Sequence, residues 1–113
     1  MVLGLLTDLF FSARIRETAK QLGVPCEILR DPATFVDRVV AATPRLVIID
    51  MNLKSGDAAA VVRDLRARAP DVTVVGYLYD AQESLMLDAE EAGCHQVLSR
   101  GQLTRKLPHL LSV

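Results

Sequence analysis

The sequence predicts an α/β domain in which a five-stranded parallel sheet is covered by helices on both faces. Short apolar segments alternate five times with longer segments whose apolar residues recur at helical spacing. The apolar segments, which we expect to be strands, are residues 2–6, 24–29, 46–49, 72–78 and 95–99. The alternation predicts parallel pairing, because each pair of parallel strands needs a long crossover connection, usually a helix.

The third apolar segment indicates the centre of the sheet. Leu46-Val47-Ile48-Ile49 is apolar without alternation, as in a strand that is buried on both faces. Five strand–helix units suit the flavodoxin-like strand order 2-1-3-4-5, which places a ligand crevice at the carboxyl ends of the first and third strands. Those ends carry Asp8 and Asp50.

Each predicted strand is followed by a segment with one apolar stripe, typical of a helix packed on a sheet. The stripes are Phe11, Ile15, Ala19 and Leu22; Phe35, Val36, Val39 and Val40; Ala58, Val61, Val62, Leu65 and Ala69; Leu85, Ala89 and Ala92; and Leu103, Leu107 and Leu110. Asp31-Pro32 predicts a helix start, and Gly23 and Gly93 follow predicted helices.

Composition excludes several classes of protein. With 113 residues, 50% of them hydrophobic and 24% charged, we expect one globular domain over residues 1–113 rather than a disordered chain. Thirteen basic and fourteen acidic residues give a net charge of −1, so no overall field attracts nucleic acid or an anionic membrane. No signal peptide or membrane-spanning segment is recognisable, and we expect a cytoplasmic protein with an aliphatic core that lacks Trp.

The two cysteines favour no special chemistry. Cys26 and Cys94 are far apart, as expected of reduced, buried thiols in a cytoplasmic protein. Cys94-His95 offers too few ligands for a metal, because His109 is the only other imidazole. A small flavodoxin-like enzyme or ligand-binding protein remains an alternative, but the sequence offers it no nucleophile–base pair beyond Cys94-His95.

Asp8 and Asp50 are the main candidates for a functional site. On adjacent strands of the predicted sheet they face the same crevice, and neighbouring carboxylates repel unless a proton or cation lies between them. A hard divalent ion is the natural partner of such a pair. The alternative is that both are ordinary turn or cap residues.

Residues 46–57, LVIIDMNLKSGD, resemble the phosphoacceptor segment of the receiver domains of bacterial two-component response regulators, and the resemblance extends over the whole chain. It implies a CheY-like fold and identifies Asp50 as the phosphoacceptor. It also implies a Mg²⁺ site formed by Asp8, Asp50 and the backbone carbonyl of Asn52. Gly93 matches the glycine before the last strand of the family.

Other positions depart from the family pattern. Thr7 replaces the first residue of the acidic pair, so Mg²⁺ should bind weakly or not at all. The conserved Thr or Ser at the end of the fourth strand falls on Leu78, and its neighbours Tyr77 and Tyr79 are not Thr or Ser either. The aromatic switch position on the fifth strand falls on Val97.

The conserved Lys-Pro pair of the family is replaced by Arg100-Gly101. Arg100 keeps a positive charge beside the acceptor, and its planar guanidinium is never neutral. It is suited to bind a phosphoryl group bidentately or to pair with Asp50 in the resting state. The alternative is a solvated residue at the start of a helix.

The resemblance and its departures together predict a function. We expect a stand-alone receiver of atypical, pseudo-receiver type that works in phosphorelay signal transduction and is not an enzyme. Asp50 would be a poor phosphoacceptor, and the partner would be a histidine kinase or another signalling protein. A phosphorylation-independent docking or dimerisation module on the same fold, including a homodimer, is the alternative.

Overall fold

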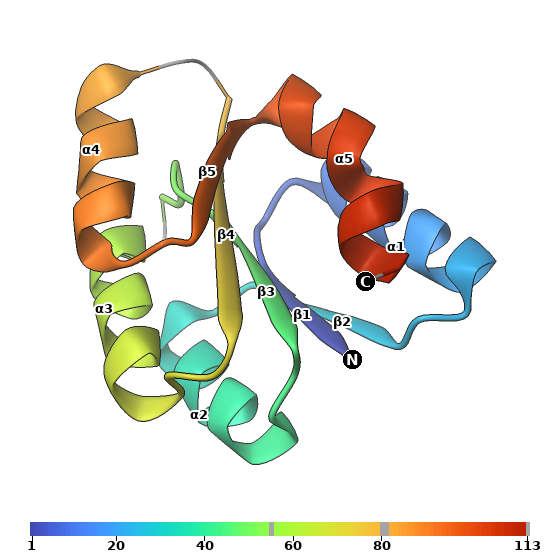
Figure 1. Cartoon of the computed structure of the whole chain (residues 1–113), viewed down its shortest axis with the longest axis horizontal. Coiled ribbons are helices and arrows are strands. Elements are labelled where there is room, and N and C mark those ends of the chain that lie inside the picture. Colours follow the sequence, from blue (N-terminus) through green and yellow to red (C-terminus); the bar gives the residue numbers. More distant parts are fainter. Residues whose placement is uncertain (55, 80–81, 113) are drawn as a thin grey trace.

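The computed structural model describes residues 1–54, 56–79 and 82–112, so that Ser55 of the acceptor segment lies outside the described residues. Strands and helices alternate along the whole chain (Figure 1). The elements are β1 (Val2–Leu5), α1 (Leu9–Leu22), β2 (Cys26–Leu29), α2 (Pro32–Ala42), β3 (Leu46–Asp50), α3 (Ala58–Arg68), β4 (Thr73–Leu78), α4 (Glu83–Ala92), β5 (Gln96–Ser99) and α5 (Arg100–Ser112).

The sheet has the predicted topology. Its strand order is β2-β1-β3-β4-β5 and every pairing is parallel, which confirms the flavodoxin-like, CheY-like fold. β3 lies at the centre, and all five of its residues are buried, including Asp50 at its carboxyl end. The second strand begins at Cys26, later than predicted, because Val24 and Pro25 form the connection from α1.

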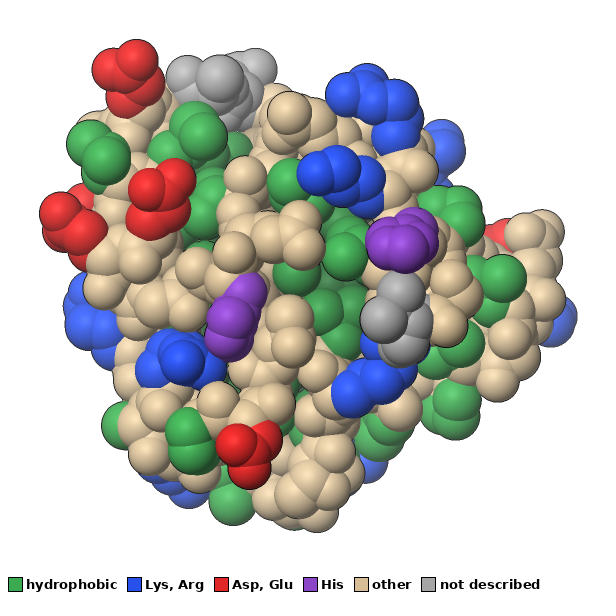
Figure 2. Space-filling view, viewed as in Figure 1, with side chains coloured by type: hydrophobic (Ala, Val, Ile, Leu, Met, Phe, Trp, Pro, Cys, Tyr) green, Lys and Arg blue, Asp and Glu red, His purple; other side chains and the backbone are tan. Residues whose placement is uncertain are grey.

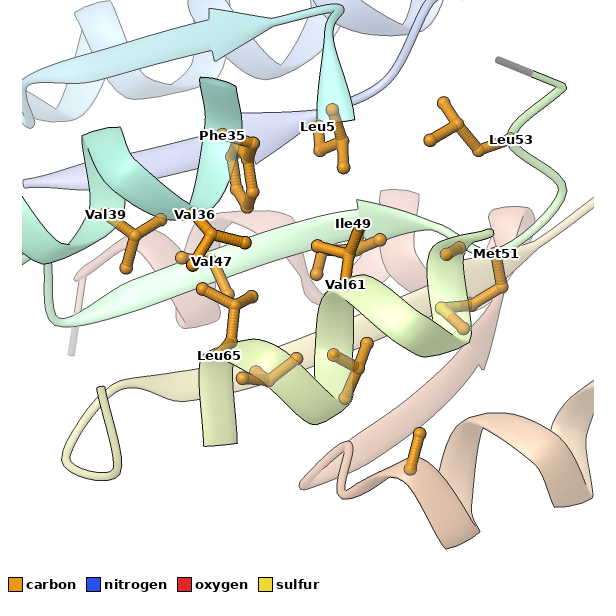
Figure 3. Packing of buried hydrophobic residues seen from close by; sticks show 14 of the residues in the cluster. Leu5, Phe35, Val36, Val39, Val47, Ile49, Met51, Leu53, Val61 and Leu65 are labelled. Atoms are coloured by element: carbon orange, nitrogen blue, oxygen red, sulfur yellow. The ribbon is translucent and has the colours of Figure 1, made fainter. Parts of the chain in front are cut away.

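Two hydrophobic layers cover the sheet. α2, α3 and α4 lie on one face, and α1 and α5 lie on the other (Figure 1). On the first face, Phe35 and Val36 of α2 pack with Leu65 of α3 against Val47 and Ile49 of β3 (Figure 3). Leu111 rather than Leu110 completes the stripe of α5, and the predicted stripe residues Leu22 and Val40 are exposed.

Local sequence signals fix the helix ends. Asp8, Asp31 and Asp57 each accept a backbone N–H bond at the start of a helix, which satisfies donors that would otherwise lack partners. Gly23 and Gly93 end α1 and α4 with φ of 70° and 119°, a conformation that favours glycine. Within the described residues, no helix combines the length and apolar character that crossing a bilayer requires.

Successive side chains of a strand point to opposite faces of the sheet, and this alternation decides which of them lie beside Asp50. Asp50 is opposite Tyr77 in the β3–β4 register, so these two side chains are on the same face, which α1 and α5 cover. Leu78 is on the opposite face. The next residue, Tyr79, follows the end of β4 and returns to the side of Asp50.

Candidate functional site

Asp50 is the most deeply buried carboxylate of the described residues, with 2% of its surface exposed. Its Oδ1 accepts a hydrogen bond of 2.8 Å from the backbone N–H of Asn52. Burial raises the pKa of the Asp50 carboxyl above its ordinary value; the Asn52 hydrogen bond opposes this, the charge of Asp8 adds to it, and Arg100 opposes it. Among the described residues, no ion pair reaches Asp50.

Asp8 uses both of its carboxylate oxygens. Oδ1 caps α1 by accepting the backbone N–H of Phe11 at 3.1 Å. Oδ2 lies 2.7 Å from Nη2 of Arg100, and the hydroxyl of Tyr79 donates to the same oxygen at 3.5 Å. Asp8 is therefore at once a helix cap and half of an ion pair, and its side chain is only 16% exposed.

Arg100 pairs with Asp8, and not with Asp50 as in the resting-state pair considered from the sequence. Its guanidinium carbon lies 4.9 Å from the centre of the Phe11 ring and 5.2 Å from that of Tyr79. Each cation–π contact is worth about 0.5–1 kcal/mol at a partly exposed site. The ion pair and the two rings therefore hold the guanidinium between α1 and the end of β4.

Reciprocal hydrogen bonds fix the backbone that carries Arg100. The Ser99 N–H donates to Oε1 of Gln102 at 2.9 Å, and the Gln102 N–H donates to Oγ of Ser99 at 3.1 Å. This is a capping box, which starts α5 at Arg100. The Ser-x-x-Gln spacing of this capping box is visible in the sequence.

The hydroxyl of Tyr79 contacts Asp8 at the crevice, whereas Leu78 lies on the other face of the sheet. Leu78, which the resemblance places at the Thr or Ser position of receivers, is 1% exposed within the α2–α4 layer, on the far face from Asp50. Tyr79 contacts Asp8 and Arg100 instead. Burial and the charges of Asp50 and Asp8 raise the pKa of the Tyr79 hydroxyl, which keeps it protonated.

Asn52 connects the loops that follow β3 and β4 through its side chain. Its Oδ1 accepts the backbone N–H of Tyr79 at 3.0 Å, and its Nδ2 donates to Oε1 of Gln82 at 3.1 Å. The family resemblance implied a role only for the backbone carbonyl of Asn52, as a metal ligand. The side chain has a separate role, because it holds Tyr79 beside the crevice.

The described residues do not fit a divalent metal in this arrangement. Among them, no three His, Cys, Asp or Glu side chains are grouped closely enough to hold an ion. A hard divalent cation takes several oxygen ligands, and carboxylates supply the negative charge that balances it. Both oxygens of Asp8 are engaged, and Thr7, half-buried beside it, has no carboxylate.

The remaining predicted positions lie away from the crevice. Val97 is half-buried and packs against the α2–α4 layer. Nδ1 of His95 accepts the backbone N–H of Val74 at 3.0 Å. Burial raises the pKa of the Cys94 thiol to about 11, so this thiol is neither a ready nucleophile nor a ready metal ligand.

Comparison by structure gives the class of fold. The receiver domain of NtrX from Brucella abortus superposes with a TM-score of 0.85 at 15% identity, covering 97% of this chain and 93% of that one. The isolated receiver domain of RcsB from Salmonella enterica gives 0.79 at 14% identity, with 98% and 84% covered. A Burkholderia pseudomallei protein provisionally assigned to pilus assembly gives 0.75 at 22% identity, with 97% and 84% covered.

The chain therefore has the fold of response regulator receiver domains, over nearly its whole length. No family model and no curated protein matches its sequence. At these identities the similarity establishes the fold alone, and the roles of Asp8, Asp50 and Arg100 stay predictions.

Proposed function

We propose that the chain is an atypical receiver-like module of phosphorelay signalling that acts through protein–protein contacts in the cytoplasm. One observation carries the proposal: a buried aspartate, Asp50, ends the central strand of a receiver fold beside a second carboxylate and an arginine. A histidine kinase or another signalling protein would be its partner. Structural likeness to receiver domains supports this choice.

In the proposed chemistry, a carboxylate oxygen of Asp50 attacks the phosphorus of a phosphohistidine or a small acyl phosphate. A P–O bond forms, the bond to the donor breaks, and the donor leaves with that electron pair. Oδ2 of Asp50 is the suited nucleophile, since Oδ1 already accepts the Asn52 N–H. Tyr79 and Arg100, which both contact Asp8, would donate to the oxygens of the transferred phosphoryl group.

Three features make Asp50 a poor acceptor in this proposal. Its raised pKa reflects a carboxylate that burial disfavours. Arg100 already has a carboxylate partner, Asp8, and must leave it to bind a phosphoryl group. Thr7 supplies no charge that would attract Mg²⁺ to balance the incoming phosphoryl oxygens.

Incubation with acetyl phosphate and Mg²⁺ is expected to modify the protein slowly and incompletely. Intact-mass spectrometry should show one added phosphoryl group, and Asp50→Asn should abolish it. Asp57→Asn is the matched control, because this exposed aspartate follows Asp50 in the chain but caps α3. Rapid stoichiometric modification would show that the departures from the receiver pattern matter less than proposed, and modification that survives Asp50→Asn would exclude Asp50 as the acceptor.

The second candidate function is phosphorylation-independent dimerisation. It is favoured by the charged and exposed apolar side chains on α4 and around the groove between α1 and α5. Acidic side chains gather over α4, and Lys and Arg side chains gather over α5 (Figure 2). A groove of about 880 Å³ lies between α1 and α5, lined by Phe10, Arg14 and Arg105 among others. Phe10 is 88% exposed, and Leu87 on α4 is 57% exposed. The α4 surface of a second copy therefore complements the groove in charge and in apolar character.

For this candidate, sedimentation velocity without any phosphodonor should show self-association that weakens as salt is added. Phe10→Ser and Leu87→Ser should each weaken it by about tenfold, since each removes an exposed apolar anchor. A mixture of the two variants should recover association through its one intact pair of surfaces. A wild-type protein that stays monomeric at all concentrations would eliminate this candidate.

A further inference from the structure

We infer that Arg100 is the resident cation of the crevice, that it excludes divalent metals, and that removing it opens a metal site between Asp8 and Asp50. The inference rests on the proposed function only in treating the two aspartates as walls of one crevice. It concerns the unmodified protein, so it stands or fails separately from phosphorylation of Asp50.

Both carboxylate oxygens of Asp8 already have partners. A divalent ion would need an oxygen of this carboxylate, but Oδ1 is held by the Phe11 N–H and Oδ2 lies 2.7 Å from Nη2 of Arg100. The guanidinium already supplies a positive charge next to the two carboxylates. A metal would have to displace it and would meet its charge at short range.

Arg100 is held in place from several directions. The Ser99–Gln102 capping box fixes its backbone at the first residue of α5. The rings of Phe11 and Tyr79 lie against its guanidinium. Displacement therefore breaks an ion pair and two ring contacts together, which raises the metal concentration needed to compete.

Removing Arg100 leaves both aspartates with a carboxylate oxygen that has no strong partner. Oδ2 of Asp8 then keeps only the long hydrogen bond from Tyr79, at 3.5 Å. Oδ2 of Asp50 accepts no hydrogen bond from any residue in the described ranges, while Oδ1 stays bonded to Asn52. Asp8 and Asp50, whose charges act on each other, then each keep a carboxylate oxygen without a cation, and carboxylate oxygens are ligands that a hard divalent ion prefers.

The test uses Mn²⁺ as the probe, with binding measured by electron paramagnetic resonance and located by line broadening of amide NMR signals. Arg100→Ala is expected to bind Mn²⁺ at least about tenfold more tightly than the wild type, a change of the size that single outer-sphere groups produce at metal sites. Broadening should centre on residues 7–8 and 50–52. Arg100→Gln, which keeps most of the side chain without its charge, gives a second measurement if the alanine variant folds poorly.

Two controls separate a specific site from a general effect of charge. Arg105→Ala removes the same charge from an exposed position on α5 and should leave Mn²⁺ affinity within about twofold of the wild type. Adding Asp8→Asn to Arg100→Ala should abolish the gained affinity. Equal affinity of the wild type and a folded Arg100 variant, an equal gain in Arg105→Ala, or a gain that survives Asp8→Asn would each overturn the inference.

Discussion

Replacing Leu78 by threonine is expected to lower the free energy of unfolding by about 2–4 kcal/mol, because the site is apolar and tightly filled. Leu78 is 1% exposed and packs in the layer formed by α2, α3 and α4. Threonine leaves a cavity there and buries a hydroxyl, which β-branching restricts to few rotamers. Threonine at this position would carry its hydroxyl on the face of the sheet opposite Asp50.

The matched variant is Tyr79→Thr, which places a hydroxyl on the same face as Asp50. Tyr79 is 41% exposed, and its loss removes one ring contact with Arg100 and the long bond to Asp8. Its cost should stay below about 1 kcal/mol. Urea unfolding of both variants measures the difference, and comparable stabilities would mean that the β3–β4 register does not separate the two side chains as described.

Asp50→Asn is expected to stabilise the protein at pH 7 by about 1–2 kcal/mol. Burial raises the pKa of this carboxyl in the folded state, so the ionised form costs stability at any pH above that raised value. The amide keeps the acceptor for the Asn52 N–H and carries no charge into the buried site. The variant should thus lose its ability to accept a phosphoryl group while gaining stability.

The stabilising effect of Asp50→Asn should depend on pH, because the pKa of Asp50 is raised in the folded state. A carboxyl whose pKa is higher in the folded state than in the unfolded state binds more protons when folded, so stability falls as pH rises through that interval. At pH values well below about 4 the carboxyl is protonated in both states, and the advantage of Asp50→Asn should disappear. Asp57→Asn, at an exposed helix cap, should change stability by less than about 0.5 kcal/mol at every pH. A gain independent of pH, or a loss at pH 7, would contradict the origin assigned to it.

The fold was predictable because periodicity, caps and strand hydrophobicity all indicate the same topology. The apolar run before Asp50 predicted the buried central strand, and Asp31-Pro32 predicted where α2 begins. Errors occurred at the ends of the elements, as with β2, which starts after Pro25. Side-chain periodicity does not define strand ends, since these depend on which backbone groups find partners in the neighbouring strand.

The site was less predictable, for a reason of geometry. A shift of one residue moves a side chain to the other face of a sheet, and Leu78, the residue matched to the family's hydroxyl position, packs on the face opposite Tyr79, which contacts Asp8. The positive charge of Arg100 was recognised, but its partner was not. Charge alone does not distinguish Asp8 from Asp50, whereas the rings of Phe11 and Tyr79 place the guanidinium beside Asp8.

The placement of the two tyrosines lets intrinsic fluorescence report on the crevice. The chain has two tyrosines and no tryptophan, so its ultraviolet emission comes from tyrosine alone. Tyr77 is buried with its ring 5.0 Å from that of Phe11, centre to centre, and its hydroxyl has no partner among the described residues. Tyr79 alone faces the solvent-accessible crevice, beside a carboxylate and a guanidinium. Changes in emission that Tyr79→Phe abolishes would follow events at the crevice in the unlabelled protein.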